Sequence, residues 1–347
     1  MTSSIDNHKV TTKEKIFKVV TYVIGILIIS YLLYKVNINN IIEILSQINL
    51  FWLVVAVFIL LLSKFLRGFL WQFYLKCVDI HLKLEKSIKI IFGGDFIGQI
   101  LISNIGFFSR PLLLKAEEKT INSSHSLASV VIEKLNALFA RVIVLFIGLI
   151  FFFFITPYEQ LIIITIVLLI FVYLILLLLA VVMITRPALF NTKVLNFFEN
   201  VLPSAIMIKI KKINHYLMNC RKGILTIITK RKKIVAGLCM QMFIHVVVMG
   251  LMFYTFLRAV NINFLSPLLF LLPSIASSLS IVPLTPLGMG FVEVFAIILF
   301  SHFGMSPSVI MSVYILIRTI DIIITTIFGG LIASDLGYKS LKGTLKH

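Results

Sequence analysis

Charged side chains stand inside apolar stretches of this sequence, and they are the residues best able to do chemistry there. Both signs occur: Arg67, Arg110, Arg141 and Arg318 are cations, and Asp95, Glu133, Glu293 and Asp321 are anions. Ionisable groups are costly in apolar segments and, where such segments span a membrane, mark binding sites or pathways by default. A guanidinium group suits a phosphodiester, because its planar fork makes two parallel hydrogen bonds. We therefore expect an anion-binding site, with Arg110 and Arg318 as the best phosphate ligands.

Several of these residues also have a purely structural interpretation. Arg318 and Asp321 stand at positions i and i+3 of one helix and could pair with each other. Glu293 follows Gly290 at the start of a helix, where a carboxylate stabilises the helix dipole, so it is either a cap or a cavity residue. Asp95 either belongs to the site or lies near the cytoplasmic surface. All stay candidates for substrate binding.

The remaining candidates are two glycines, a carboxylate and an arginine. Gly288 and Gly290 would let backbone amides point at an anion, although any tight turn also uses glycine. Glu133 is expected to face the same cavity as Glu293, where both balance arginines or bind a cationic headgroup. Arg67 either reaches this cavity or extends its charged group to the membrane surface.

The composition is that of a membrane protein. Hydrophobic residues make up 60% of the 347 residues and charged residues 13%, and the mean hydropathy is +1.07. Several apolar runs reach the length of about 20 residues that crosses a bilayer as a helix, whereas the short alternating segments of a β-barrel do not occur. The predicted fold is all-α, a polytopic helical bundle integral to the membrane.

The formal net charge of +18 reflects topology and does not indicate a nucleic-acid partner. Lysines and arginines stand mostly between the apolar runs, as expected when positive charge gathers on the cytoplasmic side. We expect a multi-pass protein of the inner (cytoplasmic) cell membrane with both termini in the cytoplasm.

Sequence signals for cofactors and for metal-dependent catalysis do not occur. The three cysteines are widely spaced, and the sequence contains no CxxC, HExxH, GxxxxGK[ST], DxD or DDxxD motif. No catalytic residue, metal or cofactor is predicted, and His245 and His302 are interpreted as ordinary interfacial residues.

The stretch 271–293 predicts a broken helix. Apolar sequence flanks it, yet it holds three prolines, two glycines and a carboxylate: Pro273, Pro283, Pro286, Gly288, Gly290 and Glu293. A continuous helix is incompatible with this punctuation. Irregular backbone within a membrane is tolerated only where protein covers it or water reaches it, so the break predicts a cavity. We interpret 265–302 as a re-entrant helical pair that enters from outside.

Residues 88–114 have the same character. Glycines, a proline and polar residues interrupt them: Gly93, Gly94, Asp95, Gly98, Asn104, Gly106, Arg110 and Pro111. Basic residues on both sides indicate a second re-entrant pair, entered from the cytoplasm. Full spans are expected at 16–34, 50–76, 124–155, 161–184, 234–258 and 307–333.

The expected organisation is a polar tail (1–15), a membrane domain (16–335) and a basic cytoplasmic tail (336–347). The membrane domain divides into halves, 16–155 and 161–333, that each hold three spans and one broken pair. Three crossings are an odd number, so the second half is inverted relative to the first. Inverted repeats with interrupted helices are typical of alternating-access transporters.

The long connection 185–233 is basic and carries an expected interfacial helix. Apolar residues fall on one face of this helix: Ile206, Ile210, Ile213, Leu217, Ile224 and Ile228. Such a face fits a helix lying on an anionic leaflet, with a lipid-sensing role. A solvated linker made basic by topology fits equally well.

The two broken stretches carry motifs that resemble the transmembrane region of lysylphosphatidylglycerol synthases, the flippase-like family of bacterial and archaeal membrane proteins. The resemblance covers roughly residues 10–335 and rests on NIGFFSRP (104–111), Glu133-Lys134-Leu135, PLTPLGMGFVE (283–293) and Arg318. The first motif departs from the family at Asn104-Ile105, where proline is frequent, and at Phe107-Phe108, where small or acidic residues are common. These departures bear on the headgroup that is recognised.

The resemblance implies a lipid translocase that moves a phospholipid or a lipid-linked anion between leaflets through a polar midplane cavity, with membrane lipids as partners. Full-length synthases carry a soluble aminoacyl-transferase domain after the membrane part. We expect this chain, which stops shortly after its last span, not to perform lysyl transfer itself. Two alternatives stay open: a membrane-embedded transferase acting on a lipid phosphate, and a non-transporting scaffold of a lipid- or glycan-synthesis complex.

Overall fold

The structure, a computed structural model, is built from helices. It describes residues 30–32, 34–36, 38–100, 104–118, 120–155, 160–185, 218–281 and 290–336, and no strand occurs among them. Five helices in this part are long and apolar enough to cross a membrane: Leu50–Cys77, Ser123–Phe154, Gln160–Val182, Arg231–Ala259 and Pro307–Leu336. They confirm the predicted all-α polytopic fold. Most of the expected first span, 16–34, lies outside the described residues.

The long helices follow the apolar runs of the sequence closely. They are α3 (Leu50–Cys77), α6 (Ser123–Ile155), α7 (Gln160–Thr185) and α14 (Pro307–Ile324). One further span joins α10 (Arg231–Met242), the π-helical turn η2 (Phe243–Val248) and α11 (Met249–Ala259). A second π-helical turn, η5 (Thr325–Gly329), continues α14. Helix α14 begins where the sequence indicates, because Ser306 caps the amide of Val309 and Pro307 fits the first helical turn.

Both punctuated stretches break as predicted. In the second, α12 (Leu268–Ser278) passes through a short 3-10 turn, η3 (Leu279–Ile281), and α13 (Phe291–Ser301) begins after Gly290. In the first, α4 (Leu84–Ile100) is followed by the 3-10 helix η1 (Asn104–Ser109) and by α5 (Arg110–Glu117). Pro283, Pro286 and Gly288 lie outside the described residues. That the pairs are re-entrant stays a prediction.

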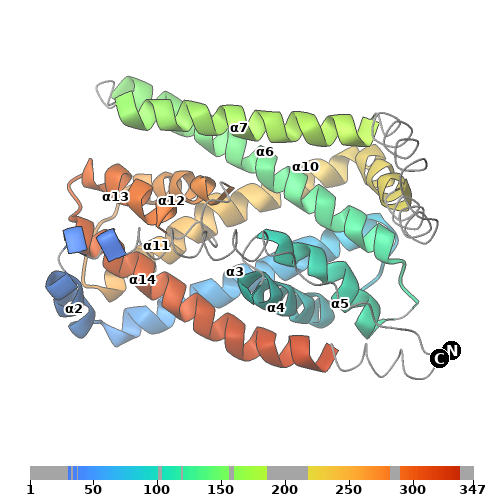
Figure 1. The fold of residues 1–347 in the computed structure, drawn as a ribbon, viewed down its shortest axis with the longest axis horizontal. Helices are drawn as coiled ribbons and strands as arrows, with labels where there is room; N and C mark the ends of the chain where they lie inside the picture. Colours follow the sequence, from blue (N-terminus) through green and yellow to red (C-terminus); the bar gives the residue numbers. More distant parts are fainter. Residues whose placement is uncertain are drawn as a thin grey trace, which may run out of the picture.

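The two broken pairs occupy opposite ends of the bundle. In Figure 1, α12 and α13 lie at the left and α4 and α5 at the right, while α3, α14 and the α10–α11 span run between them. Helix α7 packs along α6 at the upper edge, and the short α2 (Ile38–Ser46) packs on α14. An inverted repeat requires such opposite placement, although the repeat itself stays a prediction.

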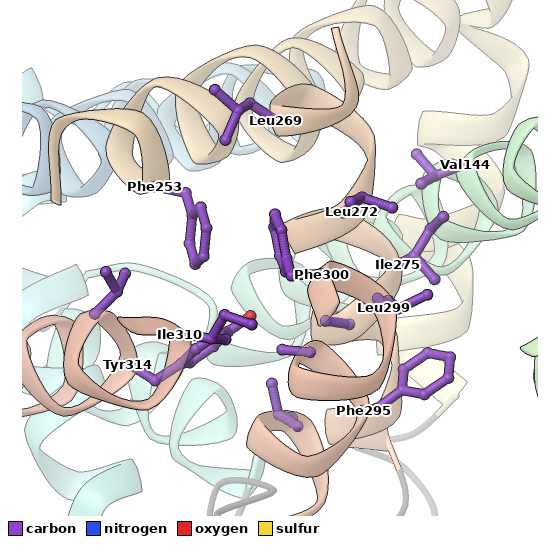
Figure 2. Close-up of a cluster of buried hydrophobic side chains, with 14 of the residues drawn as sticks. Val144, Phe253, Leu269, Leu272, Ile275, Phe295, Leu299, Phe300, Ile310 and Tyr314 are labelled. Atoms are coloured by element: carbon purple, nitrogen blue, oxygen red, sulfur yellow. The ribbon is translucent and has the colours of Figure 1, made fainter. Parts of the chain in front are cut away.

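Aromatic and aliphatic packing fixes the α12–α13 pair against its neighbours. The rings of Phe253 on α11 and Phe300 on α13 stack with their centroids 4.7 Å apart, and Tyr314 of α14 lies 5.7 Å from Phe253. Figure 2 shows this cluster, with Leu272 and Ile275 of α12 beside it. The packing sets the position of α13, and therefore of the polar residues at its start.

Residues 218–229 form a helix that docks on the bundle. Cys220, Ile224 and Ile227 are buried in the same apolar cluster as residues of α3, α4 and α6, and burial raises the pKa of the Cys220 thiol to about 11. Ile224 therefore packs on protein, whereas Ile228 is exposed. The other residues of the expected interfacial face lie outside the described residues.

Candidate functional site

A buried lysine joins the two halves of the chain. Lys64 stands at the middle of α3 with 3% of its side chain exposed, and its Nζ lies 2.7 Å from Asp321 Oδ1 on α14 and 3.2 Å from Asp95 Oδ2 on α4. It also donates a hydrogen bond of 2.9 Å to Thr325 Oγ1. Asp321 likewise stands near the middle of its span, so this contact lies deep in the membrane if the helices cross it along their axes.

Asp95 collects cations from two further positions. Arg67 reaches inward and places Nη2 2.8 Å from Asp95 Oδ2, which answers the question of its direction. Arg110 lies 3.9 Å from the other oxygen of Asp95. Its Nη1 also donates to both carboxylate oxygens of Glu133, at 3.0 and 3.1 Å. Asp95, Glu133, Arg67 and Arg110 thus belong to one buried network, at the junction of α3, α4, α5 and α6.

Arg110 is enclosed within this network. Only 2% of its side chain is exposed, and its guanidinium carbon lies 6.0 Å from the ring centre of Trp71. The break before α5 brings it there, because Arg110 is the first residue of that helix. In this conformation Arg110 links the helices of the first pair, and its assignment as a phosphate ligand stays a prediction.

Glu293 combines the two roles that the sequence left open. Its Oε2 accepts a hydrogen bond of 2.7 Å from the backbone amide of Gly290, which closes the first turn of α13. Its Oε1 accepts one of 2.8 Å from Nε of Arg318 on α14. Gly290 has a φ of 87°, a conformation that favours glycine. The turn thus needs glycine and holds the carboxylate against the arginine.

Arg318 and Asp321 line a cavity of about 280 Å³ beside the second broken pair. Its walls come from α3, α11, α12 with η3, α13 and α14: Leu60, Ser63, Met249, Met252, Ser277, Ser280, Val292, Tyr314, Ile317, Arg318 and Asp321. The side chain of Asp321 is 41% exposed, in contrast to its partner Lys64. Leu60 of α3 and Met252 of α11 belong to the apolar part of the cavity wall, and Arg318 and Asp321 of α14 form its charged part.

A smaller pocket of about 150 Å³ lies against the same arginine. Glu293, Met311, Tyr314, Ile315, Arg318, Thr319 and Ile322 line it. Arg318 and Tyr314 border both hollows, and Ile322 is one of the exposed apolar residues of α14. A headgroup held by Arg318 would therefore have apolar surface on two sides.

Two further cations inside the described part of the bundle stand on α6. Lys134 holds its Nζ 4.4 Å from the ring centre of Phe107, and Arg141 donates to His245 Nε2 at 3.2 Å and to Tyr173 Oη at 3.1 Å. Tyr173 in turn donates to the carbonyl of Ser278, where α12 ends. The sequence predicts that His245 is an isolated interfacial residue, whereas in the structure it is hydrogen-bonded to Arg141.

The interior groups named so far contain two more cations than carboxylates. The cations are Lys64, Arg67, Arg110, Lys134, Arg141 and Arg318; the carboxylates are Asp95, Glu133, Glu293 and Asp321. An excess of positive charge in a low-dielectric interior favours an anionic ligand.

Sequence reasoning did not assign Lys64, Lys134, Arg141 or His245 to the site. Lys64 carried a usable signal, because it stands in the middle of an apolar span one helical turn before Arg67. Nothing in the sequence around His245 indicated its role, since its partner Arg141 comes from the distant helix α6.

A family model described as the lysylphosphatidylglycerol synthase TM region matches residues 18–329. No curated protein and no solved structure matches the chain.

Proposed function

We propose, starting from the fact that the chain belongs to the lysylphosphatidylglycerol synthase TM-region family, that it is a lipid translocase for an anionic phospholipid or lipid-linked phosphate. The observation that carries the proposal is the cavity beside the broken α12–α13 pair, with Arg318 in its wall. A spanning bundle needs neither a helix break nor a charged cavity for its stability, whereas a lipid headgroup that crosses the membrane needs a polar path through the apolar layer.

Arg318 is the proposed phosphate ligand. Its Nε is engaged by Glu293, which fixes the plane of the guanidinium group from the start of α13. Arg318 lines the cavity, and the planar fork of a guanidinium group matches two oxygens of a phosphodiester. Glu293 is thus a positioning residue for Arg318, and the turn at Gly290 positions Glu293.

The two hollows around Arg318 suit a lipid better than a soluble anion. The larger is lined by Leu60, Met249 and Met252 on its apolar side. The smaller includes Ile315 and Ile322 of α14, where exposed apolar side chains would face acyl chains. A lipid could keep its tails in the bilayer while its headgroup lies at Arg318.

The broken pairs supply elements that can move. A helix that ends inside the bundle can tilt or shift without dragging a continuous span with it, and the two pairs lie at opposite ends of the molecule. Alternate opening at the two ends would expose the cavity first to one leaflet and then to the other. No nucleotide-binding motif occurs in the sequence, so downhill movement or an ion gradient would supply the energy.

Reconstitution tests the proposal directly. Purified protein in phosphatidylcholine vesicles receives a trace of NBD-labelled phosphatidylglycerol, and dithionite then destroys the fluorescence of the outer leaflet only. We expect the protein to speed the exchange of label between leaflets well beyond protein-free vesicles. Folded protein that moves no anionic lipid would favour the scaffold alternative, and conversion of the labelled lipid to a new species would favour the transferase.

A further inference from the structure

We propose that Asp321 is a proton-binding site, through which one proton crosses the membrane together with each anionic headgroup. The proposal rests on the proposed function and adds to it the energy source, a pH gradient. It makes the proton a second substrate of the cavity.

Asp321 differs from the other interior carboxylates in its access to the cavity. Its side chain is 41% exposed and lines the hollow, and its ion pair is with Lys64 at 2.7 Å. Asp95 lies among Lys64, Arg67 and Arg110, so three ion pairs oppose its protonation. A proton that enters the cavity reaches Asp321 first. Protonation of Asp321 then has to weaken only its ion pair with Lys64.

Glu133 and Glu293 are less suited to exchange protons. Glu133 takes two hydrogen bonds from Arg110, and Glu293 takes one from Arg318 and one from the amide of Gly290. Both side chains are 6% exposed. Protonation of either would break a buried charge-assisted hydrogen bond.

The charged groups around Asp321 come from four elements. They are Lys64 and Arg67 of α3, Asp95 of α4, Glu293 of α13 and Arg318 of α14 itself. Helix α11 contributes the uncharged Met249 and Met252 to the cavity wall. Helix α2 packs near Met311, about 15 Å along α14 from Asp321, and its Glu43 is exposed. Lys64 is therefore the cation that protonation of Asp321 affects most.

Lys64 can tolerate a neutral Asp321. Its Nζ still has Asp95 at 3.2 Å and Thr325 Oγ1 at 2.9 Å when Asp321 carries a proton. Thr325 also lies 3.5 Å from Asp321 Oδ1, so that the hydroxyl touches both groups. Lys64 therefore does not become an unpaired buried charge. The chemical step is the protonation of the Asp321 carboxylate to a carboxylic acid.

Charge balance couples this proton to the lipid. The ion-paired cluster of Lys64, Arg67 and Arg110 with Asp95, Glu133 and Asp321 is neutral, and Glu293 balances Arg318. A phosphodiester at Arg318 adds one negative charge, one helical turn from Asp321. Two anions so close in a low-dielectric cavity repel each other. A proton on Asp321 removes this repulsion and keeps the ion-paired groups of α3, α4, α13 and α14 at the net charge they have without lipid, while Lys134 and Arg141 on α6 keep their charges throughout.

The coupling predicts electroneutral movement, and this can be measured. Vesicles of phosphatidylcholine containing the protein receive NBD-phosphatidylglycerol in the outer leaflet, under one of two driving forces. One is a gradient of one pH unit, acidic outside, with the membrane potential clamped to zero by potassium and valinomycin. The other is a potassium diffusion potential at equal pH.

We expect the pH gradient to accumulate the label in the inner leaflet by up to about tenfold, the limit for one proton per lipid at one pH unit. The diffusion potential should have no effect, because the lipid and the proton cancel. Zwitterionic NBD-phosphatidylcholine should not respond to the gradient. Movement that follows the potential and ignores the pH gradient overturns the coupling but leaves the translocase standing, whereas no movement of any anionic lipid overturns both.

Substitutions assign the effect to Asp321. Asp321→Asn imitates the protonated state, so the protein should still exchange label between leaflets but should no longer accumulate it under the gradient. Asp321→Glu should keep accumulation. Asp79→Asn is the control, since Asp79 pairs with Lys230 far from the cavity. Accumulation by D321N at the wild-type level overturns the assignment, and so does folded D321N that exchanges no lipid, because the protonated state must accept lipid.

Discussion

Single residues decide where a charge can be held within this bundle. Glu293 accepts a hydrogen bond from the amide of Gly290 with one oxygen and from Arg318 with the other. The residue that caps the helix therefore also orients a cation. Lys64 serves two carboxylates and a hydroxyl on two helices. Burying any of these charged groups alone in an apolar interior would cost free energy, and the hydrogen bonds and ion pairs with its partners offset that cost.

Replacing Glu293 by Gln separates its two roles. The glutamine oxygen can still accept the Gly290 amide, so α13 should keep its first turn, but the charge that orients Arg318 is lost. Losing a charge-assisted hydrogen bond of about 1.5–3 kcal/mol predicts roughly tenfold or greater slowing of lipid exchange, with an unchanged yield of folded protein. Arg318→Ala should slow exchange at least as much.

The matched control is Glu85→Gln, which removes an exposed pair with Lys89 on the surface of α4. It should leave exchange as it is. If E293Q and R318A lower the folded yield and the exchange rate in parallel, both residues act through stability and the phosphate site is wrong.

Replacing Lys64 by Met tests the network through stability. The change keeps an unbranched side chain, shorter by one atom, but leaves Asp95 and Asp321 without their shared cation. We expect a loss of about 1–3 kcal/mol in the free energy of unfolding, less than for a fully buried broken pair, because Asp95 keeps Arg67 and the side chain of Asp321 is 41% exposed. Thermal unfolding in detergent measures it.

The double variant K64M/D321N should recover part of that loss, since it removes the charge of Asp321, the carboxylate that depends most on Lys64. If the stability loss of the double variant equals the sum of the losses of the two single variants, Lys64 and Asp321 do not interact in the folded protein.

Helices approach each other closely where glycine allows it. A Cβ at Gly329 in the π-helical turn of α14 would collide with the backbone carbonyl of Phe92 on α4 and come within 2.8 Å of Phe96 Cβ. This contact sets the distance between α4, which carries Asp95, and α14, which carries Asp321. Small residues at helix contacts within membranes have this role generally.

Gly329→Ala should therefore destabilise the protein by about 1–3 kcal/mol, because backbone cannot move aside as a flexible side chain can. Gly330→Ala is the matched control one residue further on. There the nearest atoms belong to the Phe96 ring at 3.4 Å, an ordinary contact. Thermal melting of the two variants side by side checks the prediction, and equal melting temperatures would contradict it.

At the scale of the whole molecule, the two ends of the bundle should face different compartments. At one end the start of α3 bonds to the end of α11, where the amide of Asn49 donates to the carbonyl of Ala259. At the other end Lys230 donates to the carbonyl of Cys77. Basic residues surround the second end, so the positive-inside rule predicts that it faces the cytoplasm.

Cysteine labelling in intact cells tests this orientation. In a protein without its native cysteines, Leu265→Cys, exposed in the loop between α11 and α12, should react with a membrane-impermeant maleimide added outside. Glu85→Cys, exposed at the start of α4, should react only after the cells are permeabilised. The reverse pattern would place the termini outside.

The sequence by itself determined five of the six expected spans and the two breaks, because apolar length, proline and glycine act locally, and its motifs indicated the family. It also singled out Arg318, Glu293, Asp95 and Asp321, since a charge in an apolar run stands out without any structure. Only the tertiary structure decided their partners. Arg318 bonds to Glu293, and Asp321 to Lys64, across helices.

The physical reason is that spans apolar on every face do not show which side turns inward. Helix rotation and register then decide which charges meet. Lys64 and Thr325 touch across a sequence separation of 261 residues. No local pattern predicts that contact; it follows from the packing of α4 against α3 on one side and against η5, the continuation of α14, on the other.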